Sequence, residues 1–409
     1  IQMEGYDVPQ YANVQYPWEG HEELHPGQIP ERFNPVGSYV KYFHVPENMK
    51  GKRVFISFQG AESGLALWLN GTFVGYSEDS FTPSEFELTE YLKEGENKLA
   101  AQVFKWTASS WCEDQDFFRF SGIYRDVYLY TVPEVHVYDL KIRAIPDETL
   151  KKASLEIVTK TWGKGKLKLT LSRKGEILLQ DEKALDGEDT CTWEILNPLL
   201  WSAEEPNLYD LDMEVYDENG MLQEIIPEKV GFRRFEMKDG IMTLNGKRIV
   251  FKGVNRHEFS SVTGRHVSRE ELIQDIVTMK QNNINAIRTC HYPDASPIYR
   301  LCDEYGLYMI AENNLESHGS WDVAELTGDY TDIVPHNKPE WLGMMLDRVN
   351  SMYQRDKNHP AILIWSCGNE SFGGKDIFEM SEFYRKNDPT RLVHYEGLFH
   401  DRSYNATSD

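Results

Sequence analysis

Short apolar runs separated by turn residues fill the first 131 positions of the chain. Residues 54–58 and 99–104 are two such runs. The run at 65–69 leads through Asn70-Gly71 into 72–76, the pattern of a tight β-hairpin. No stretch of useful length with a helical period interrupts them. The pattern therefore predicts a jelly-roll-like β-sandwich over residues 1–132.

A second set of strand patterns occupies residues 133–235. Polar and apolar residues alternate at 166–171 and again at 209–216, and the second run closes with the turn residues Asp217-Glu218-Asn219-Gly220. About one hundred residues of half-buried strands is typical of an immunoglobulin-like β-sandwich.

From residue 236 onward the pattern alternates between strands and helices. Residues 251–254 predict a buried strand, and Ser268 with Glu271 forms a capping box that opens a helix. One face of that helix is apolar, with Leu272, Ile273, Ile276, Val277 and Met279. Further strands are predicted at 286–288, 307–310, 362–365 and 392–395, and helices at 297–305, 341–353 and 376–384.

This alternation indicates a parallel sheet with right-handed crossovers. Polar residues follow four of the five strands, as they do at the catalytic face of a (β/α)₈ TIM barrel. Five strands do not close such a barrel. We therefore expect residues 236–409 to be its N-terminal part, with the other strands beyond Asp409 or on another chain.

The charge and cysteine content narrow the classes of partner. Acidic residues outnumber basic ones by 66 to 43, for a net charge of -23, which disfavours nucleic acid and anionic membranes as partners. The five cysteines contain no C-x-x-C pair, which indicates free thiols in a reducing compartment. The chain starts at Ile1, so we expect its true N-terminus to be missing, and we predict a cytoplasmic protein.

Asn369-Glu370 is the strongest candidate for catalysis. It follows the apolar strand 362–365, and a carboxyl group at a strand end is well placed as a general acid. A carboxylate at the start of a helix is an equally good interpretation of the same residues. Glu316 and His318, two residues apart on one side of a segment expected to be extended, could hold a divalent cation together with Glu370, although such a pair also occurs by chance.

Two histidines and an acidic loop complete the candidates. His257 and His291 both lie near strand ends, where an imidazole can bind a polyol or orient a carboxylate; a single such histidine is more often structural. Residues 113–116 are rich in carboxylates and flanked by Trp106, Trp111, Phe117 and Phe118. This combination suits either a sugar-binding site or an ordinary solvated loop.

Several motifs resemble glycoside hydrolase family two. Trp365-Ser366-Cys367-Gly368-Asn369-Glu370-Ser371 is similar to the acid/base signature of that family, with a departure at Cys367. The loop 113–116 followed by 121–127 is similar to the bacterial-type β-galactosidase branch, as are 11–14 with 16–17, 253–258 and 355–360. The order of a sugar-binding sandwich, an immunoglobulin-like domain and a TIM barrel is also the order in that family.

The resemblance implies hydrolysis of terminal non-reducing β-D-galactose, as in lactose, with retention of configuration. It implies that Glu370 is the acid/base, that Asn369 binds the sugar 2-hydroxyl, and that His257 and His291 contact other hydroxyls. Glu316, His318 and Glu370 would hold Mg²⁺ or Mn²⁺. Asp116 would bind Na⁺ and the galactose primary hydroxyl, with Asn13 nearby on the sugar.

The same resemblance places the nucleophile on the seventh barrel strand, beyond Asp409. Glu396 follows the fifth strand and so occupies the wrong strand for that role. A homo-oligomer is expected for the full-length protein. The alternatives are a β-glucuronidase or β-mannosidase of the same family, or a non-catalytic carbohydrate-binding or assembly subunit.

Overall fold

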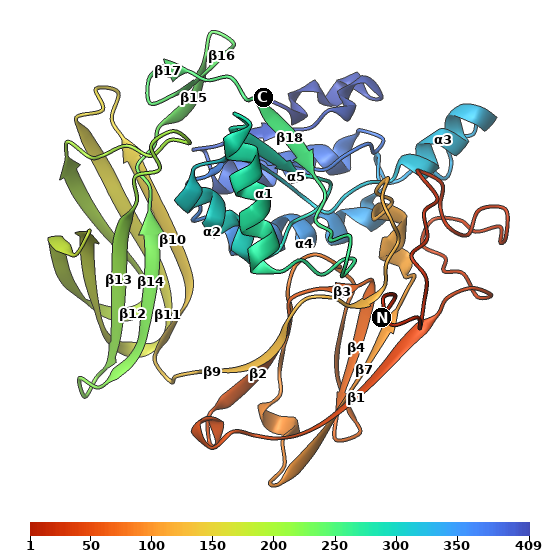
Figure 1. Ribbon diagram of the computed structural model, residues 1–409, viewed down its shortest axis with the longest axis horizontal. Helices are drawn as coiled ribbons and strands as arrows, with labels where there is room; N and C mark the ends of the chain where they lie inside the picture. Colours follow the sequence, from red (N-terminus) through yellow and green to blue (C-terminus); the bar gives the residue numbers. More distant parts are fainter.

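Alternating burial along its strands gives the first part of the chain two facing sheets. In the computed structural model, which describes residues 1–409, one sheet has the order β1-β7-β4-β5 and the other β6-β2-β9, with a small pair β3-β8 (Figure 1). These strands are β1 (Val36–His44), β2 (Arg53–Phe58), β3 (Ala61–Glu62), β4 (Gly64–Leu69), β5 (Thr72–Ser77), β6 (Ser84–Glu87), β7 (Glu96–Phe104), β8 (Gly122–Ile123) and β9 (Val127–Val132). Ile56, Leu67 and Val103 are among the side chains buried between them. The predicted hairpin is confirmed, since Asn70 and Gly71 connect β4 to β5 with positive φ angles.

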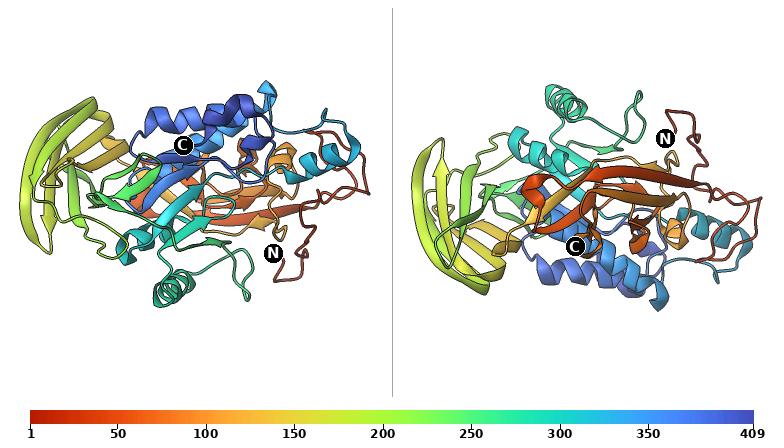
Figure 2. Two further views of the ribbon diagram at one scale, coloured as in Figure 1. Left: turned by 90° about the horizontal axis from the view of Figure 1, so that it is seen from above. Right: turned by 90° about the horizontal axis from the view of Figure 1, so that it is seen from below.

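One long strand organises the second part of the chain. Its strands are β10 (His136–Pro146), β11 (Lys152–Arg173), β12 (Glu176–Leu196), β13 (Tyr209–Asp217) and β14 (Leu222–Val230). Strand β11 pairs with β12 along its length, and on its other edge first with β10 and then, after a register shift, with β13. Alternate side chains such as Leu155, Leu169 and Met213 form its separate core. In both views of Figure 2 this sandwich lies at one end of the molecule.

The third part of the chain is built on a parallel sheet. A small antiparallel sheet of β15 (Phe235–Lys238), β16 (Ile241–Leu244) and β17 (Lys247–Arg248) leads into it. The parallel strands are β18 (Gly253–Arg256), β19 (Ala286–Thr289), β20 (Tyr308–Glu312), β21 (Ile362–Ser366) and β22 (Leu392–His394), adjacent in that order. The helices are α1 (Arg269–Gln281), α2 (Ser296–Tyr305), α3 (His318–Thr327), α4 (Pro339–Asp356) and α5 (Lys375–Asn387). The capping box at Ser268 and Glu271 is present at the start of α1.

Two expectations about this part are wrong. The first strand begins at Gly253 rather than at residue 251, and Gly253, Val254 and Asn255 are exposed because β18 is an edge strand with a neighbour on one side only. Helix α3 was not predicted. Because His318 is its first residue, Glu316 and His318 lie at a strand-to-helix junction and not on an extended segment.

All five cysteines are free thiols and buried. None of the helices combines the length and the apolar character needed to cross a membrane.

Candidate active site

The carboxyl ends of the parallel strands bring together the residues that the sequence singled out. His257 follows β18, His291 follows β19, Glu316 and His318 follow β20, and Asn369 with Glu370 follows β21. Parallel strands present their carboxyl ends at one edge of the sheet, so residues more than one hundred positions apart meet there.

Glu370 is paired with a histidine from the segment that follows the neighbouring strand, β20. Its Oε2 lies 2.6 Å from Nδ1 of His318, and its backbone N–H donates to Oε1 of Glu396 at 3.3 Å. The hydrogen bond from His318 lowers the pKa of Glu370, and the same contact raises the pKa of His318. Helix α5 starts only at Lys375, so Glu370 is not a helix-start carboxylate.

Asn369 is buried and held from two sides. Its Oδ1 accepts a hydrogen bond of 2.9 Å from Nη2 of Arg288, and its Nδ2 donates to Oε2 of Glu316 at 3.0 Å. Arg288 in turn donates through Nε to Oε2 of Glu312 at 2.5 Å. Sequence reasoning missed Arg288 and Glu312, although a charged residue inside each of two apolar strands was a usable signal.

Glu316, His318 and Glu370 form a group that could hold a metal ion. One ligand atom from each residue lies within 4.8 Å of the other two. Oε1 of Glu316 is buried and has no hydrogen-bond partner, and burial raises the pKa of Glu316 well above its usual range. A bound cation would satisfy this oxygen and favour its ionised form. The two carboxylates therefore fit a hard divalent ion of the Mg²⁺ or Mn²⁺ class, for which the imidazole of His318 is a less usual ligand.

Both candidate histidines have one ring nitrogen engaged. Nδ1 of His257 lies 3.2 Å from the Tyr292 hydroxyl, and its ring stacks on Phe117 with centroids 4.3 Å apart. Burial, together with the neighbouring His291 and Arg265, lowers the pKa of His257 to about 4. Nδ1 of His291 lies 2.6 Å from Oε1 of Glu312. His257 is therefore neutral near pH 7, which suits a residue that binds hydroxyl groups.

The acidic loop of the first sandwich is docked against this strand edge. The backbone N–H of Asp114 donates to the carbonyl of Glu316 at 2.9 Å, and that of Glu316 donates to the carbonyl of Cys112 at 3.0 Å. Glu113 is paired with Arg348 of α4 at 2.6 Å. For these two acidic residues the interpretation as a solvated loop is wrong.

Asp116 is the exposed carboxylate of the loop. Its Oδ1 accepts a hydrogen bond of 2.7 Å from the Tyr11 hydroxyl. Asn13, also exposed, has a φ of 55°, and its carbonyl accepts from Nη2 of Arg119 at 3.4 Å. Asp116 belongs to none of the clusters of three possible metal ligands, so the donor set around it does not by itself indicate a sodium site.

Family models cover almost all of the chain. "Glycosyl hydrolases family 2, sugar binding domain" matches residues 1–133, "Glycosyl hydrolases family 2" matches 135–233, and "Glycosyl hydrolases family 2, TIM barrel domain" matches 235–408. The chain belongs to glycosyl hydrolases family 2. The resemblance read from the sequence is thereby confirmed, as is the presence of a sugar-binding, an immunoglobulin-like and a TIM-barrel domain.

Curated relatives match from end to end of the chain. A β-galactosidase of Halalkalibacterium halodurans is 54% identical over 100% of this chain and 41% of that protein. One from Streptococcus thermophilus is 52% identical over 100% of this chain and 40% of that protein. A "Beta-galactosidase large subunit" of Leuconostoc lactis is 46% identical over 98% of this chain and 66% of that protein. The chain thus spans about two fifths of the length of the first two relatives.

Solved structures share the fold. A β-glycosidase from Bacteroides vulgatus has a TM-score of 0.74 and 26% identity, over 95% of this chain and 49% of that one. A β-glucuronidase from Ruminococcus gnavus, in complex with D-glucaro 1,5-lactone, has a TM-score of 0.77 and 22% identity, over 90% of this chain and 65% of that one. At that identity the second likeness concerns the fold alone.

Proposed function

We propose that this chain is the part of a retaining β-galactosidase that carries the acid/base carboxyl group and most of the galactose site. The observation that carries the proposal is the pairing of Glu370 with His318 beside an asparagine fixed by Arg288 and Glu316. β-Galactosidases 44–54% identical over at least 98% of the chain support galactosides such as lactose as substrates.

Glu370 would protonate the departing glycosidic oxygen and then take a proton from water. Asn369 has two N–H bonds on Nδ2. Glu316 takes one of them, which leaves the other for the sugar 2-hydroxyl. Because Arg288 holds the amide oxygen, the amide cannot flip, and this contact is already in place when the transition state forms. His257 and His291 would bind further hydroxyls.

Glu316, His318 and Glu370 would hold Mg²⁺ or Mn²⁺, whose charge would tune the acid/base carboxyl group. Asp116 would bind the primary hydroxyl of galactose, with Asn13 nearby. Sodium at Asp116 stays a prediction, and no step is assigned to it.

A retaining mechanism also needs a second carboxylate about 5 Å from the first as the nucleophile. We assign it to the remainder of a TIM barrel of which β18–β22 are the first five strands. Glu396 lies beside Glu370 but follows the fifth strand. In most relatives one longer polypeptide would supply that remainder; the name "large subunit" of some relatives suggests that a separate subunit can do so. We expect the complete enzyme to be a cytoplasmic homo-oligomer.

The preference between galactosides and glucuronides tests the proposal against the alternative of a β-glucuronidase. A glucuronidase must neutralise a substrate carboxylate, whereas Asp116 in its proposed role would put a negative charge beside the sugar. We expect the complete enzyme to prefer p-nitrophenyl β-galactoside over the β-glucuronide by at least about 100-fold in kcat/KM, since like charges repel by several kcal/mol. Faster hydrolysis of the glucuronide would contradict the proposal. Absence of turnover on any glycoside, with the remaining barrel present, would favour a binding or assembly subunit.

A further inference from the structure

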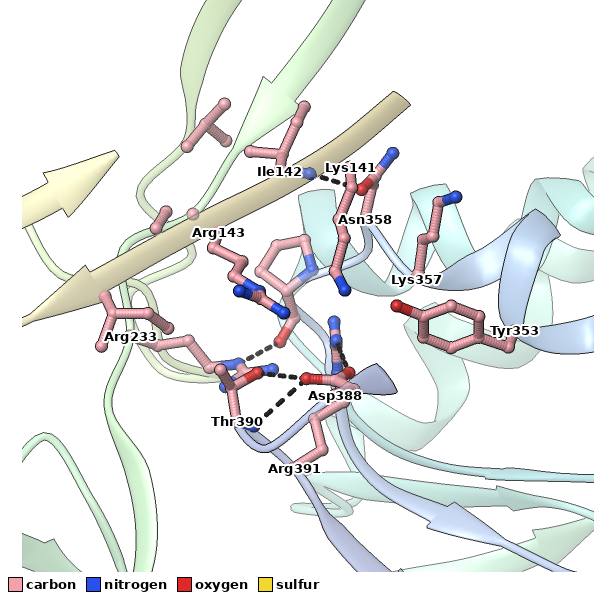
Figure 3. A pocket seen from close by; sticks show the side chains of 15 residues that line it. Lys141, Ile142, Arg143, Arg233, Tyr353, Lys357, Asn358, Asp388, Thr390 and Arg391 are labelled. Atoms are coloured by element: carbon pink, nitrogen blue, oxygen red, sulfur yellow. Dashed lines mark hydrogen bonds and ion pairs between the residues drawn. The ribbon is translucent and has the colours of Figure 1, made fainter. Parts of the chain in front are cut away.

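A small cleft lies where the immunoglobulin-like sandwich meets the amino-terminal end of the parallel sheet. It encloses about 40 Å³ and is lined by Lys141 and Arg143 of β10, by Arg233, and by Lys357, Asp388 and Arg391 of the third part of the chain (Figure 3). Pro360, at its edge, precedes β21, whose other end leads to Glu370. The cleft is therefore remote from the candidate active site.

Positive charge is in excess in this cleft, although the chain as a whole has a net charge of -23. Five cationic side chains line it. Three carboxylates accompany them: Asp388 pairs with Arg391, Asp139 with Lys357, and Glu156 with Arg143 at 3.2 Å. Two of the five cations, Lys141 and Arg233, therefore have no ion-pair partner.

Arg233 is the clearest of the unneutralised cations. Its side chain is buried, and its nitrogens donate only to backbone carbonyls, that of Pro360 at 2.8 Å and that of Ile362 at 2.7 Å. Burial, with Arg391 beside it, lowers the pKa of Arg233 to about 9. A buried charge is costly when it lacks a charged partner.

Arg143 supplies an unused hydrogen-bond donor. Its Nε is buried without a hydrogen-bond partner, whereas its Nη1 binds Glu156. Figure 3 shows the side chains of Arg143, Arg233 and Arg391 lying around the cleft with Asp388 among them. An anion between these side chains would satisfy the free donor and offset the excess charge together.

We propose that this cleft binds a small tetrahedral oxyanion of the phosphate class. A volume of 40 Å³ has room for roughly three water molecules, so it accepts one phosphate group and excludes a whole sugar. A phosphate monoester carries about two negative charges at pH 7, which matches the excess. The anion joins Lys141 and Arg143 of the sandwich to Arg391 of the parallel sheet and thereby stabilises the junction between the two domains. The proposal does not depend on the hydrolytic activity.

Calorimetric titration of the complete protein with inorganic phosphate tests it, with ionic strength held constant by sodium chloride. We expect one saturable site and a rise of the melting temperature with phosphate concentration. Arg143→Gln should weaken binding at least about tenfold, since it removes a charge-assisted contact. Glu156→Gln is the matched control, because it breaks the same ion pair but keeps the guanidinium; its affinity should be unchanged or higher.

A second titration, with glucose 6-phosphate, distinguishes the two sources of the group. Tighter binding of the ester assigns the cleft to a phosphorylated metabolite, and tighter binding of inorganic phosphate assigns it to the free ion; either supports the proposal. Three results would overturn it: no saturable binding of either, equal affinity in wild type and Arg143→Gln, or an equal rise in melting temperature with chloride alone.

Discussion

Arg265 joins the first sandwich to the parallel-sheet domain beneath the candidate active site. It contacts Glu62 through Nε at 3.1 Å and Nη2 at 3.3 Å, and it donates through Nη1 to the Tyr292 hydroxyl at 3.1 Å. The same hydroxyl lies 3.2 Å from Nδ1 of His257. The guanidinium also sits 5.0–5.3 Å from four aromatic ring centroids, those of Phe81, Phe117, Phe120 and Tyr292. Removing Arg265 should therefore affect both stability and the position of His257.

The expected loss in Arg265→Met is about 3–5 kcal/mol of unfolding free energy at pH 7, the range for breaking a buried ion pair on one side. The loss of cation–π contacts adds up to about 2 kcal/mol. Domains are stable by only about 5–15 kcal/mol, so a loss of this size can unfold the protein. Arg265→Lys is therefore a useful second variant, because it keeps the positive charge and loses only the bidentate contact with Glu62.

Urea unfolding of wild type, Arg265→Met, Glu62→Gln and the double variant measures the coupling energy between Arg265 and Glu62 in a double-mutant cycle. We expect a coupling energy of about 2 kcal/mol or more, and a fall in kcat/KM in Arg265→Met that exceeds the fall in Glu62→Gln, because Tyr292 loses its donor only in the former. A loss below about 1 kcal/mol in Arg265→Met, or additive single effects, would refute the reasoning.

Three further predictions concern the site itself. Magnesium should raise the melting temperature of the wild-type protein but not that of His318→Ala. The control variant Asp322→Asn, which removes a carboxylate 3.1 Å from Nε2 of the same histidine, should keep the response. An equal response in His318→Ala would show that His318 is structural and not a metal ligand. The pKa of His257 is lowered to about 4, whereas an unfolded histidine titrates near 6.5, so this residue destabilises the fold progressively as the pH falls from about 6.5 towards 4. The unfolding free energy of His257→Gln should therefore rise relative to that of wild type between pH 7 and pH 5. A difference between the two proteins that stays constant with pH would contradict this prediction. Asp116→Ala should raise KM for β-galactosides by about tenfold, because it removes one hydrogen bond to a charged group. KM for β-arabinosides, which lack the 6-hydroxymethyl group, should not change. An equal rise in KM for both substrates would show that Asp116 does not contact the primary hydroxyl.

Local signals predicted most of the fold. The Asn70-Gly71 hairpin and the Ser268–Glu271 capping box depend on neighbours a few residues apart, and both are present. Helix α3 was missed because it begins with His318-Gly319-Ser320, which are poor helix formers, and has no side-chain cap such as the one that marks the start of α1. The exposure of β18 follows from its place at the sheet edge, which no local pattern records.

The candidate site was predictable in its residues but not in its connections. Glu370, Asn369, Glu316, His318, His257 and His291 were all selected from strand ends. Whether a carboxylate is solvated or buried depends on a distant partner, however, as with Glu113 and Arg348, 235 positions apart. Arg288 did carry a local signal, a charge inside an apolar strand, but nothing nearby in the sequence showed that it would hold Asn369, 81 positions away.

The role of Glu370 is the central claim, and leaving-group dependence tests it most directly. In the complete enzyme, Glu370→Gln should reduce kcat/KM for lactose by at least about 100-fold, the usual contribution of general acid catalysis. It should reduce kcat/KM far less for an aryl β-galactoside whose phenol has a low pKa, since such a leaving group departs without a proton. Equal losses on both substrates would contradict the assignment of Glu370 as the general acid.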